Sequence, residues 1–129
     1  MRNILIVLLF IVVATGCKNG SSYAPMAPVV VPASGVSFQQ NVKPLFTQYR
    51  CVTCHGGTSG LTVATVAQLL RGGLHGPAVI PGSADSSLIV RKISPNPPFG
   101  ARMPQGGPYM PDSIISIIRT WIDEGARDN

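Results

Sequence analysis

Hydrophobic and polar positions divide the chain into an apolar leader, a stretch without periodicity and several short amphipathic segments. The first amphipathic segment places five large apolar residues at helical spacing: Phe38, Val42, Leu45, Phe46 and Tyr49. Pro44 lies inside this run, and proline is best accepted in the first turn of a helix. A regular helix is therefore expected to begin near Lys43 and to run into the cysteines that follow it.

Two short helices are predicted in the middle of the chain. Residues 65–71 should form the first, capped by Thr65 and stopped by Gly72 and Gly73. Residues 83–93 should form the second. Its inward-facing apolar residues would be Leu88, Ile89 and Ile93.

The final helix is predicted over residues 112–124 and should end at Gly125. Its broad apolar face comprises Ile114, Ile115, Ile117, Ile118, Trp121 and Ile122. Residues 76–82 should be extended, and residues 94–111 should be irregular because they hold six prolines and three glycines. Since strand-like alternation is confined to residues 61–63 and no repeat is present, the pattern predicts an all-α domain over residues 36–129.

The leader has the features of a secretory signal peptide. Arg2 precedes an unbroken run of eleven apolar residues, 4–14, which is too short to span a bilayer as a helix. Residues 14–17, "ATGC", resemble the lipobox of bacterial lipoproteins, a resemblance that implies cleavage before Cys17 and attachment of a lipid to it. An ordinary secretory signal, with Cys17 an incidental thiol, is the alternative. Residues 1–16 are thus interpreted as a signal peptide.

The segment after the leader is interpreted as a tether. Residues 17–35 begin with the lipidated cysteine and are rich in Ser, Gly, Pro and Ala, without helical period. The protein is therefore expected to be exported to the periplasm or cell envelope and anchored to a membrane by lipid. Lys18 is not the Asp that retains many lipoproteins at the inner membrane, which weakly favours the outer membrane.

Composition and charge narrow the function. The 129 residues carry a formal net charge of +5, which falls to +4 once residues 1–16, with the single charge of Arg2, are removed. Basic residues are spread along the chain without aromatic residues between them, so nucleic-acid binding is not expected. The five acidic residues form no paired-carboxylate pattern, and we expect no enzymatic site of that kind.

The three cysteines have separate roles. Cys17 is the candidate for lipidation, and Cys51 and Cys54 lie with His55 in the sequence "CVTCH". This Cys-x-x-Cys-His pattern is the attachment signature of c-type haem, in which two thiols bond the porphyrin edge and the histidine binds iron. A zinc site would need two more ligands where only His75 remains, and a thioredoxin-like site would need a βαβ context.

Residues 36–126 resemble the mono-haem cytochrome c domains of exported bacterial proteins. The matching stretches are "FQQNVKPLFTQYRCVTCHG", "LLRGGLHGPAVIPGSADSSLIVRKI", "ARMPQGG" and "IIRTWIDEGA". The resemblance implies a small class I cytochrome c-like fold with crossing terminal helices, wrapped around one covalent haem c. It also implies electron transfer to redox partner proteins, with no small-molecule substrate.

The iron needs a sixth ligand, and four residues are candidates. Met103 lies in "RMPQGG", where Pro104 favours an extended conformation, and the resemblance implies that it is the axial methionine. Met110 matches a position that packs in the core, Met26 lies in the tether, and His75 would give a bis-histidine site. A site with no sixth ligand also remains open.

The surroundings of the haem are less defined. In class I cytochromes a Gly-Pro segment accepts a hydrogen bond from the haem histidine, and Gly76 and Pro77 resemble it, although an ordinary turn explains them equally well. Candidate donors to the haem propionates are Arg91, Lys92, Arg102 and Trp121. A surface charge or, for Trp121, a place in the core explains each of them equally well.

Three functions are compared. The first is a membrane-tethered electron carrier with His55 and Met103 as iron ligands. The second is a haem subunit of a larger oxidoreductase. The third, a ligand-binding or peroxidase-like haem protein, would need a distal His and Arg pair that the chain does not supply.

Overall fold

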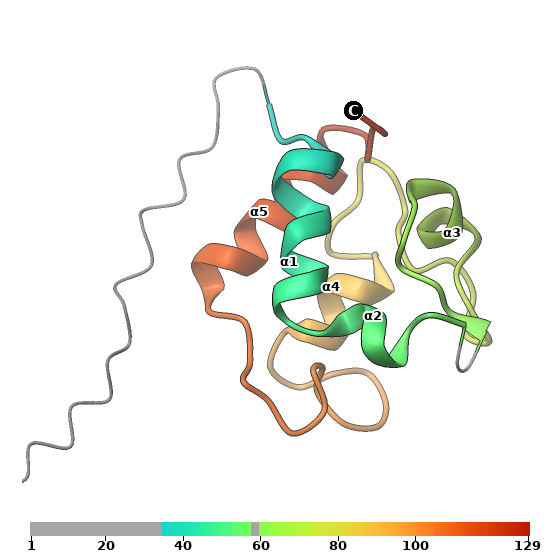
Figure 1. Ribbon diagram of the computed structural model, residues 1–129, viewed down its shortest axis with the longest axis vertical. Coiled ribbons are helices and arrows are strands. Elements are labelled where there is room, and N and C mark those ends of the chain that lie inside the picture. The colour runs from blue at the N-terminus through green and yellow to red at the C-terminus, as the bar shows by residue number, and fades with distance from the viewer. Residues whose placement is uncertain (1–34, 58–59) are drawn as a thin grey trace, which may run out of the picture.

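The computed structural model describes residues 35–57 and 60–129, so the predicted signal peptide, Cys17, the tether and Met26 lie outside the described residues. The described part is helical without strands, as an all-α fold requires, and contains two isolated β-bridges, between Gly56 and Thr62 and between Gly73 and Gly76. None of its helices has the length and apolar character needed to cross a membrane. The elements are η1 (Phe38–Val42), α1 (Lys43–Gln48), α2 (Cys51–Cys54), α3 (Val66–Arg71), α4 (Leu88–Ile93) and α5 (Asp112–Asp123) (Figure 1).

The first helical segment begins earlier than Pro44 alone predicts. The regular helix α1 does start at Lys43, but a π-helical turn, η1, precedes it. In this turn the N–H of Lys43 donates to the carbonyl of Phe38, and the side chain of Ser37 caps the start by accepting from the N–H of Gln40. Proline cannot donate to the preceding turn, so a wider turn at this point keeps the surrounding hydrogen bonds.

The predicted continuation of this helix into the cysteines is wrong. Arg50 adopts a left-handed conformation (φ 57°) and separates α1 from the single turn α2. The N–H of Arg50 still donates to Thr47, and its carbonyl accepts from the N–H of Thr53. The chain therefore changes direction at Arg50, and the two cysteines lie on a helical turn of their own.

Helix α3 matches its prediction closely. The side chain of Thr65 accepts from the N–H of Gln68, and the side chain of Gln68 accepts from the N–H of Thr65 in return, forming a complete capping box. Gly72 ends the helix with φ 73° and ψ −152°, a conformation that is essentially restricted to glycine.

Helix α4 is shorter than the predicted 83–93 segment. Residues before Leu88 form turns because the buried hydroxyl of Ser87 holds them together: it accepts from the N–H of Ile80 at 2.8 Å and donates to the carbonyl of Ser83 at 2.9 Å. Val90 and Ile93 are the residues of α4 that enter the core, whereas Leu88 and Ile89 are half-buried.

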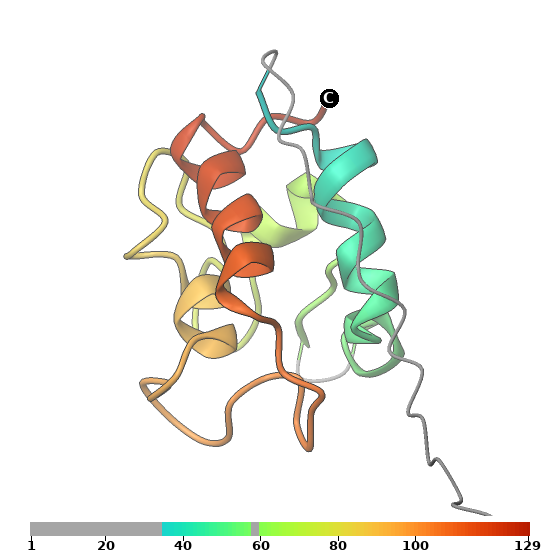
Figure 2. The same cartoon turned by 90° about the vertical axis from the view of Figure 1, so that its left-hand side faces the viewer.

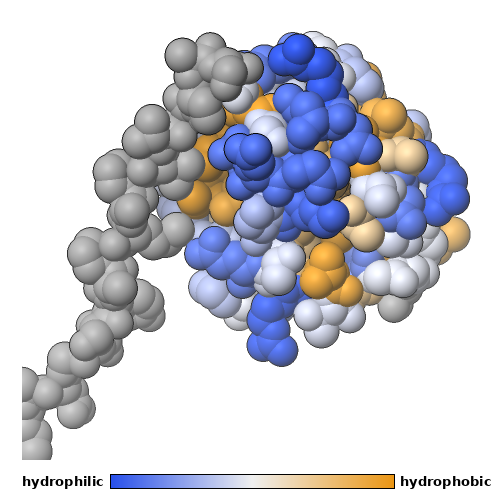
Figure 3. Space-filling model, turned by 45° about the horizontal axis from the view of Figure 1, so that its top comes forward, coloured by the Kyte–Doolittle hydropathy of each residue, from blue (hydrophilic) through white to orange (hydrophobic). Residues whose placement is uncertain are grey.

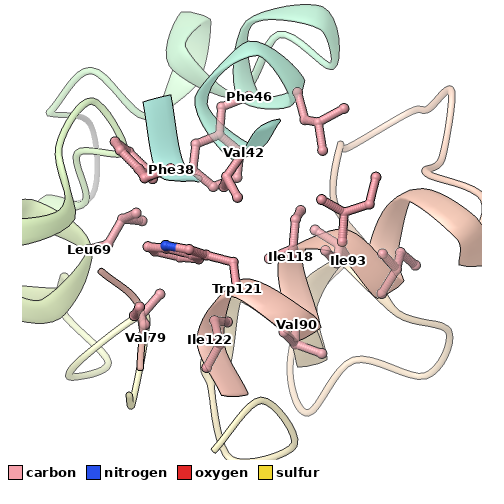
Figure 4. Close-up of a cluster of buried hydrophobic side chains, with 14 of the residues drawn as sticks. Phe38, Val42, Phe46, Leu69, Val79, Val90, Ile93, Ile118, Trp121 and Ile122 are labelled. Atoms are coloured by element: carbon pink, nitrogen blue, oxygen red, sulfur yellow. The ribbon is translucent and has the colours of Figure 1, made fainter. Parts of the chain in front are cut away.

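The core is centred on Trp121 of α5. This indole is 1% exposed, its ring centroid lies 5.3 Å from that of Phe38, and its Nε1 donates to the carbonyl of Arg127. Figure 4 shows buried side chains from η1, α1, α3, α4 and the 76–82 segment gathered around Trp121 and its neighbours in α5. All six apolar residues predicted for the last helix are buried. The packing of η1 against α5 brings the first and last helical segments into contact, as the resemblance implied.

The C-terminal residues secure the start of the domain. The carboxylate of Glu124 accepts from the N–H of Val36, and the carbonyl of Asn129 accepts from the N–H of Gln39. The C-terminus accordingly lies beside the start of η1 in both ribbon views, while residues 94–111 loop out beyond α4 at the other end (Figures 1 and 2). Hydrophilic residues cover most of the face that carries the C-terminus, with hydrophobic residues in separate places (Figure 3).

Gly72→Ala should destabilise the protein by about 3 kcal/mol or more, because the new Cβ would be held in a strained conformation and would collide with the carbonyl of Gly76. Gly82→Ala is the comparison, since its φ of 75° is also positive but no atom lies within 4 Å of the new Cβ. We expect this variant to lose about 1–2 kcal/mol. Thermal unfolding followed by circular dichroism measures both. Equal losses in the two variants would contradict the contact with Gly76.

Candidate functional site

A largely apolar cavity of about 320 Å³ lies between three segments of the chain. One wall comes from the residues after α2, one from the turn between α3 and α4, and one from α4 with the 99–105 part of the long loop. The residues that carry its chemistry or line its mouth are His55, Leu74, His75, Lys92, Phe99 and Met103. This volume lies within the range of small-molecule and cofactor sites in proteins.

His55 is held at the cavity by its backbone. Its N–H donates to the carbonyl of Cys51 at 2.8 Å, and its carbonyl accepts from the N–H of Val63 at 3.2 Å. The N–H of Gly57 in turn donates to the carbonyl of Leu61, so the chain doubles back directly after the motif. The short strand-like pattern at 61–63 thus serves to fix the position of the histidine.

The imidazole of His55 is half-buried and suited to bind a metal. Its Nδ1 is buried and has no hydrogen-bond partner among the described residues. Burial lowers the pKa of His55, so the ring is neutral at neutral pH and keeps a lone pair for coordination. An unpaired buried nitrogen costs stability, which a bound group that used this ring would offset.

The two cysteines differ in environment. Cys51 is half-buried against the core, and burial raises the pKa of its thiol to about 11, with hydrogen bonding by the backbone opposing and the nearby Cys54 adding to the rise. Its Sγ lies 3.9 Å from the carbonyl oxygen of Tyr49. Cys54 is exposed, and both are free thiols. Residues i and i+3 share one face of a helical turn, so both can meet one edge of a flat ligand, although neither is among the described residues that line the cavity.

Met103 reaches the same cavity from the long loop. It is half-buried against the core, and its N–H donates to the carbonyl of Lys92 at 2.8 Å. Met110, by contrast, is 2% exposed inside the core and does not line the cavity, in keeping with the packing role expected for it.

His75 also lines this cavity, which sequence reasoning treated only as a minor possibility. Its ring is exposed and lies against the ring of Phe99, with a centroid distance of 4.2 Å. The structure therefore gathers His55, Met103 and His75 around one space. Phe99 and Leu74 were missed altogether. The sequence signal for such residues is a large apolar side chain isolated in a glycine- or proline-rich loop.

The orientation of His55 by Gly76 and Pro77 stays a prediction. The carbonyl of Gly76 accepts from the N–H of Gly73 at 3.1 Å, as in the ordinary turn that was the alternative, and the buried Nδ1 of His55 has no hydrogen-bond partner among the described residues. Trp121 is buried in the core and bonded to Arg127 instead of facing the cavity.

The four candidate propionate donors lie in different environments. Arg91 is exposed and does not line the cavity. Lys92 lines it. Arg102 is occupied by the carbonyls of Ile93 and Met110.

The side chains at the cavity suit a metal that is already held by most of its ligands in a cofactor. Within residues 35–57 and 60–129, no three His, Cys, Asp or Glu side chains lie close enough together to hold a metal ion. The cavity instead offers an apolar wall, one neutral imidazole and a thioether. An iron held by the four nitrogens of a porphyrin needs only two protein ligands, so these residues fit a haem.

Comparison with known proteins agrees with this site. A family model described as Planctomycete cytochrome C matches residues 51–105, a segment that begins at Cys51 and includes both cavity histidines and Met103. No curated protein and no solved structure matches the chain. The family match supports a cytochrome c-like domain, which implies haem c binding and, in general, electron transfer.

Proposed function

We propose that the chain is a mono-haem c-type cytochrome that transfers electrons, with haem attached through Cys51 and Cys54 and its iron bound by His55 and Met103. The observation that carries this proposal is that His55, directly after the two thiols, and Met103, from a distant loop, line one apolar cavity. The match to a cytochrome c family model over the same residues supports it. The chain then acts as an electron carrier, not as an enzyme.

The residues around the cavity have distinct roles in this function. Bound haem supplies a one-electron couple at iron. The neutral imidazole of His55 donates a lone pair, and a methionine thioether, which is soft and uncharged, favours ferrous iron and raises the reduction potential. The apolar lining keeps water and charge away from the metal, which acts in the same direction.

The competing functions receive less support from the site. A peroxidase-like protein needs a cationic arginine and a histidine on the open face, and Lys92 is the one basic residue besides the histidines among the described residues that line the cavity. A role as the haem subunit of a larger oxidoreductase uses the same site. Co-purification from the native host separates that second candidate from a free carrier.

The location of the carrier is a further part of the proposal. The apolar leader and the "ATGC" sequence support export, lipidation of Cys17 and a membrane anchor in the periplasm or cell envelope. The tether then lets the domain reach redox partner proteins near the membrane surface.

Haem attachment is tested with the two thiols. When the protein is expressed with a cytochrome c maturation system, haem should stay with the chain through denaturing electrophoresis and acid-acetone extraction. The Cys51→Ala, Cys54→Ala variant should lose this bound haem because no thioether can form. Haem staining of the gel measures it, and an unstained wild-type band disproves covalent attachment.

Iron ligation is tested with a series of substitutions. Oxidised wild type should show a far-red sulfur-to-iron charge-transfer band, which Met103→Ala should abolish. Met103→His should stay low-spin and lower the potential by roughly 0.2–0.3 V, within the range that axial ligands control. Met110→Leu should keep the band and cost less than about 1.5 kcal/mol, since it conserves volume in the core. If the band survives Met103→Ala, the ligand is another residue. A wild type with no band and a low potential indicates His75.

Lipidation is tested at Cys17. Radioactive palmitate should label the wild-type protein in cells and place it in the membrane fraction. Cys17→Ser should remove the label, because the acyl chains need this residue. Freely soluble, unlabelled wild-type protein after export would show that the leader is an ordinary signal peptide.

A further inference from the structure

Two basic side chains fasten the loop that carries Met103 to the end of α4. We propose that Lys92 and Arg102 are positioning residues that hold Met103 at the cavity and thereby control how often the iron loses its sixth ligand. This inference rests on the proposed role of Met103 as that ligand.

Lys92 acts from the helix side. Its Nζ donates to the carbonyl of Phe99 at 2.5 Å and to the carbonyl of Ala101 at 2.7 Å. The same ammonium lies 4.7 Å from the ring centroid of Phe99, a cation–π distance. One side chain thus fixes the backbone of the loop at two points directly before Met103. Hydrogen bonds from a charged donor are stronger than those between neutral groups.

Arg102 acts from the loop side. Its Nε donates to the carbonyl of Ile93, the last residue of α4, at 2.7 Å, and a terminal nitrogen donates to the carbonyl of Met110 at 3.3 Å. The guanidinium lies 4.5 Å from the ring centroid of Tyr109. Met110 is buried in the core. The bond from Arg102 to Met110 therefore attaches the chain directly before Met103 to a fixed part of the domain.

The end of α4 receives these contacts because its carbonyls need partners. The last carbonyls of a helix have no partner within the helix. Here the carbonyl of Lys92 accepts from the N–H of Met103, and that of Ile93 accepts from Arg102. The loop that presents the proposed ligand is therefore also the C-terminal cap of α4. Separation of Met103 from the cavity would leave both carbonyls without these donors.

The loop has little other support of its own. Residues 94–111 contain no helix or strand and are rich in proline and glycine. Besides the contacts of Lys92 and Arg102, the stack of Phe99 on His75 joins this loop to the turn between α3 and α4. The equilibrium between a held and a released Met103 is therefore set by the two basic side chains together with the backbone bond from Met103 to the carbonyl of Lys92.

The test uses holo-protein and the variants Lys92→Met and Arg102→Met, which keep apolar bulk but remove the donors. Arg91→Met is the matched control: it removes the same charge from the adjacent position of α4, where the arginine is exposed and its side chain forms no hydrogen bond within the described part of the chain. Lys92→Arg tests rescue by another cationic donor. For each variant we measure the far-red band, the rate of carbon monoxide binding to reduced protein, and amide hydrogen exchange in peptides covering 94–111.

Lys92→Met and Arg102→Met should each speed carbon monoxide binding and loop exchange by at least about tenfold, because each variant loses two charge-assisted hydrogen bonds from the closed state. Their far-red band should weaken, Arg91→Met should match wild type, and Lys92→Arg should restore most of the wild-type values. If Lys92→Met, Arg102→Met and Arg91→Met show equal rates and equal bands, and the wild-type band is present, the positioning role is overturned while Met103 ligation stands. A wild type without the band overturns Met103 ligation, and the positioning role falls with it.

The hydrogen-exchange measurement distinguishes release of the loop from unfolding of the whole variant. If a variant merely unfolds, exchange rises throughout the protein, including α5, and the band disappears with the fold. Faster exchange confined to 94–111, with α5 unchanged, is the result expected of released positioning. If one variant shows uniformly raised exchange, the other variant decides the outcome, since Lys92 and Arg102 bond the loop to α4 through separate hydrogen bonds.

Discussion

The packing of Trp121 against Phe38 joins the last helix to the first helical turn, and the rest of the domain depends on that contact. Apart from α5, no helix of the described chain has more than six residues, and such short helices are not stable alone in water. They persist because their apolar faces reach the core around Trp121 and because side chains such as Thr65 and Ser37 satisfy their ends. Tertiary burial therefore supplies what local propensity does not.

The same arrangement explains why the site lies where it does. The core gathers on the side of α5, whereas Leu61, Leu88 and Ile89 are only half-buried on the cavity side. Apolar surface that stays exposed contributes nothing to the stability of the folded protein. A ligand that covers this surface and binds only the folded state shifts the folding equilibrium toward the folded state. On the proposed function, haem completes the core. Fold and cofactor binding are then two parts of one equilibrium.

Sequence reasoning succeeded where local chemistry decides the structure. The start of α1 near Pro44, the capping box of α3 and the buried face of α5 follow from short-range patterns. It failed where no local signal marks the structure. The left-handed turn at Arg50 lies inside a helical pattern, and the turns before α4 are held in part by α5, where the carboxylate of Asp123 accepts from the N–H of Ala84. The same is true of the site: the motif identifies His55, but only the fold brings His75 to the same cavity and pairs the carbonyl of Gly76 with the N–H of Gly73.

Two candidate sixth ligands, His75 and Met103, lie in one cavity. Whether haem binds and which residue becomes the sixth ligand are therefore two separate questions. His75 is carried by a turn closed by paired hydrogen bonds between Gly73 and Gly76, and its ring rests on Phe99. Met103 is carried by a loop fixed to α4. Phe99 belongs to that loop, so a contact that holds Met103 in place also holds the ring on which His75 stacks. On the proposed function, the Cys-x-x-Cys-His motif determines that haem binds. The contacts of α4 with the long loop then determine which residue meets the iron, and therefore at what potential the carrier works.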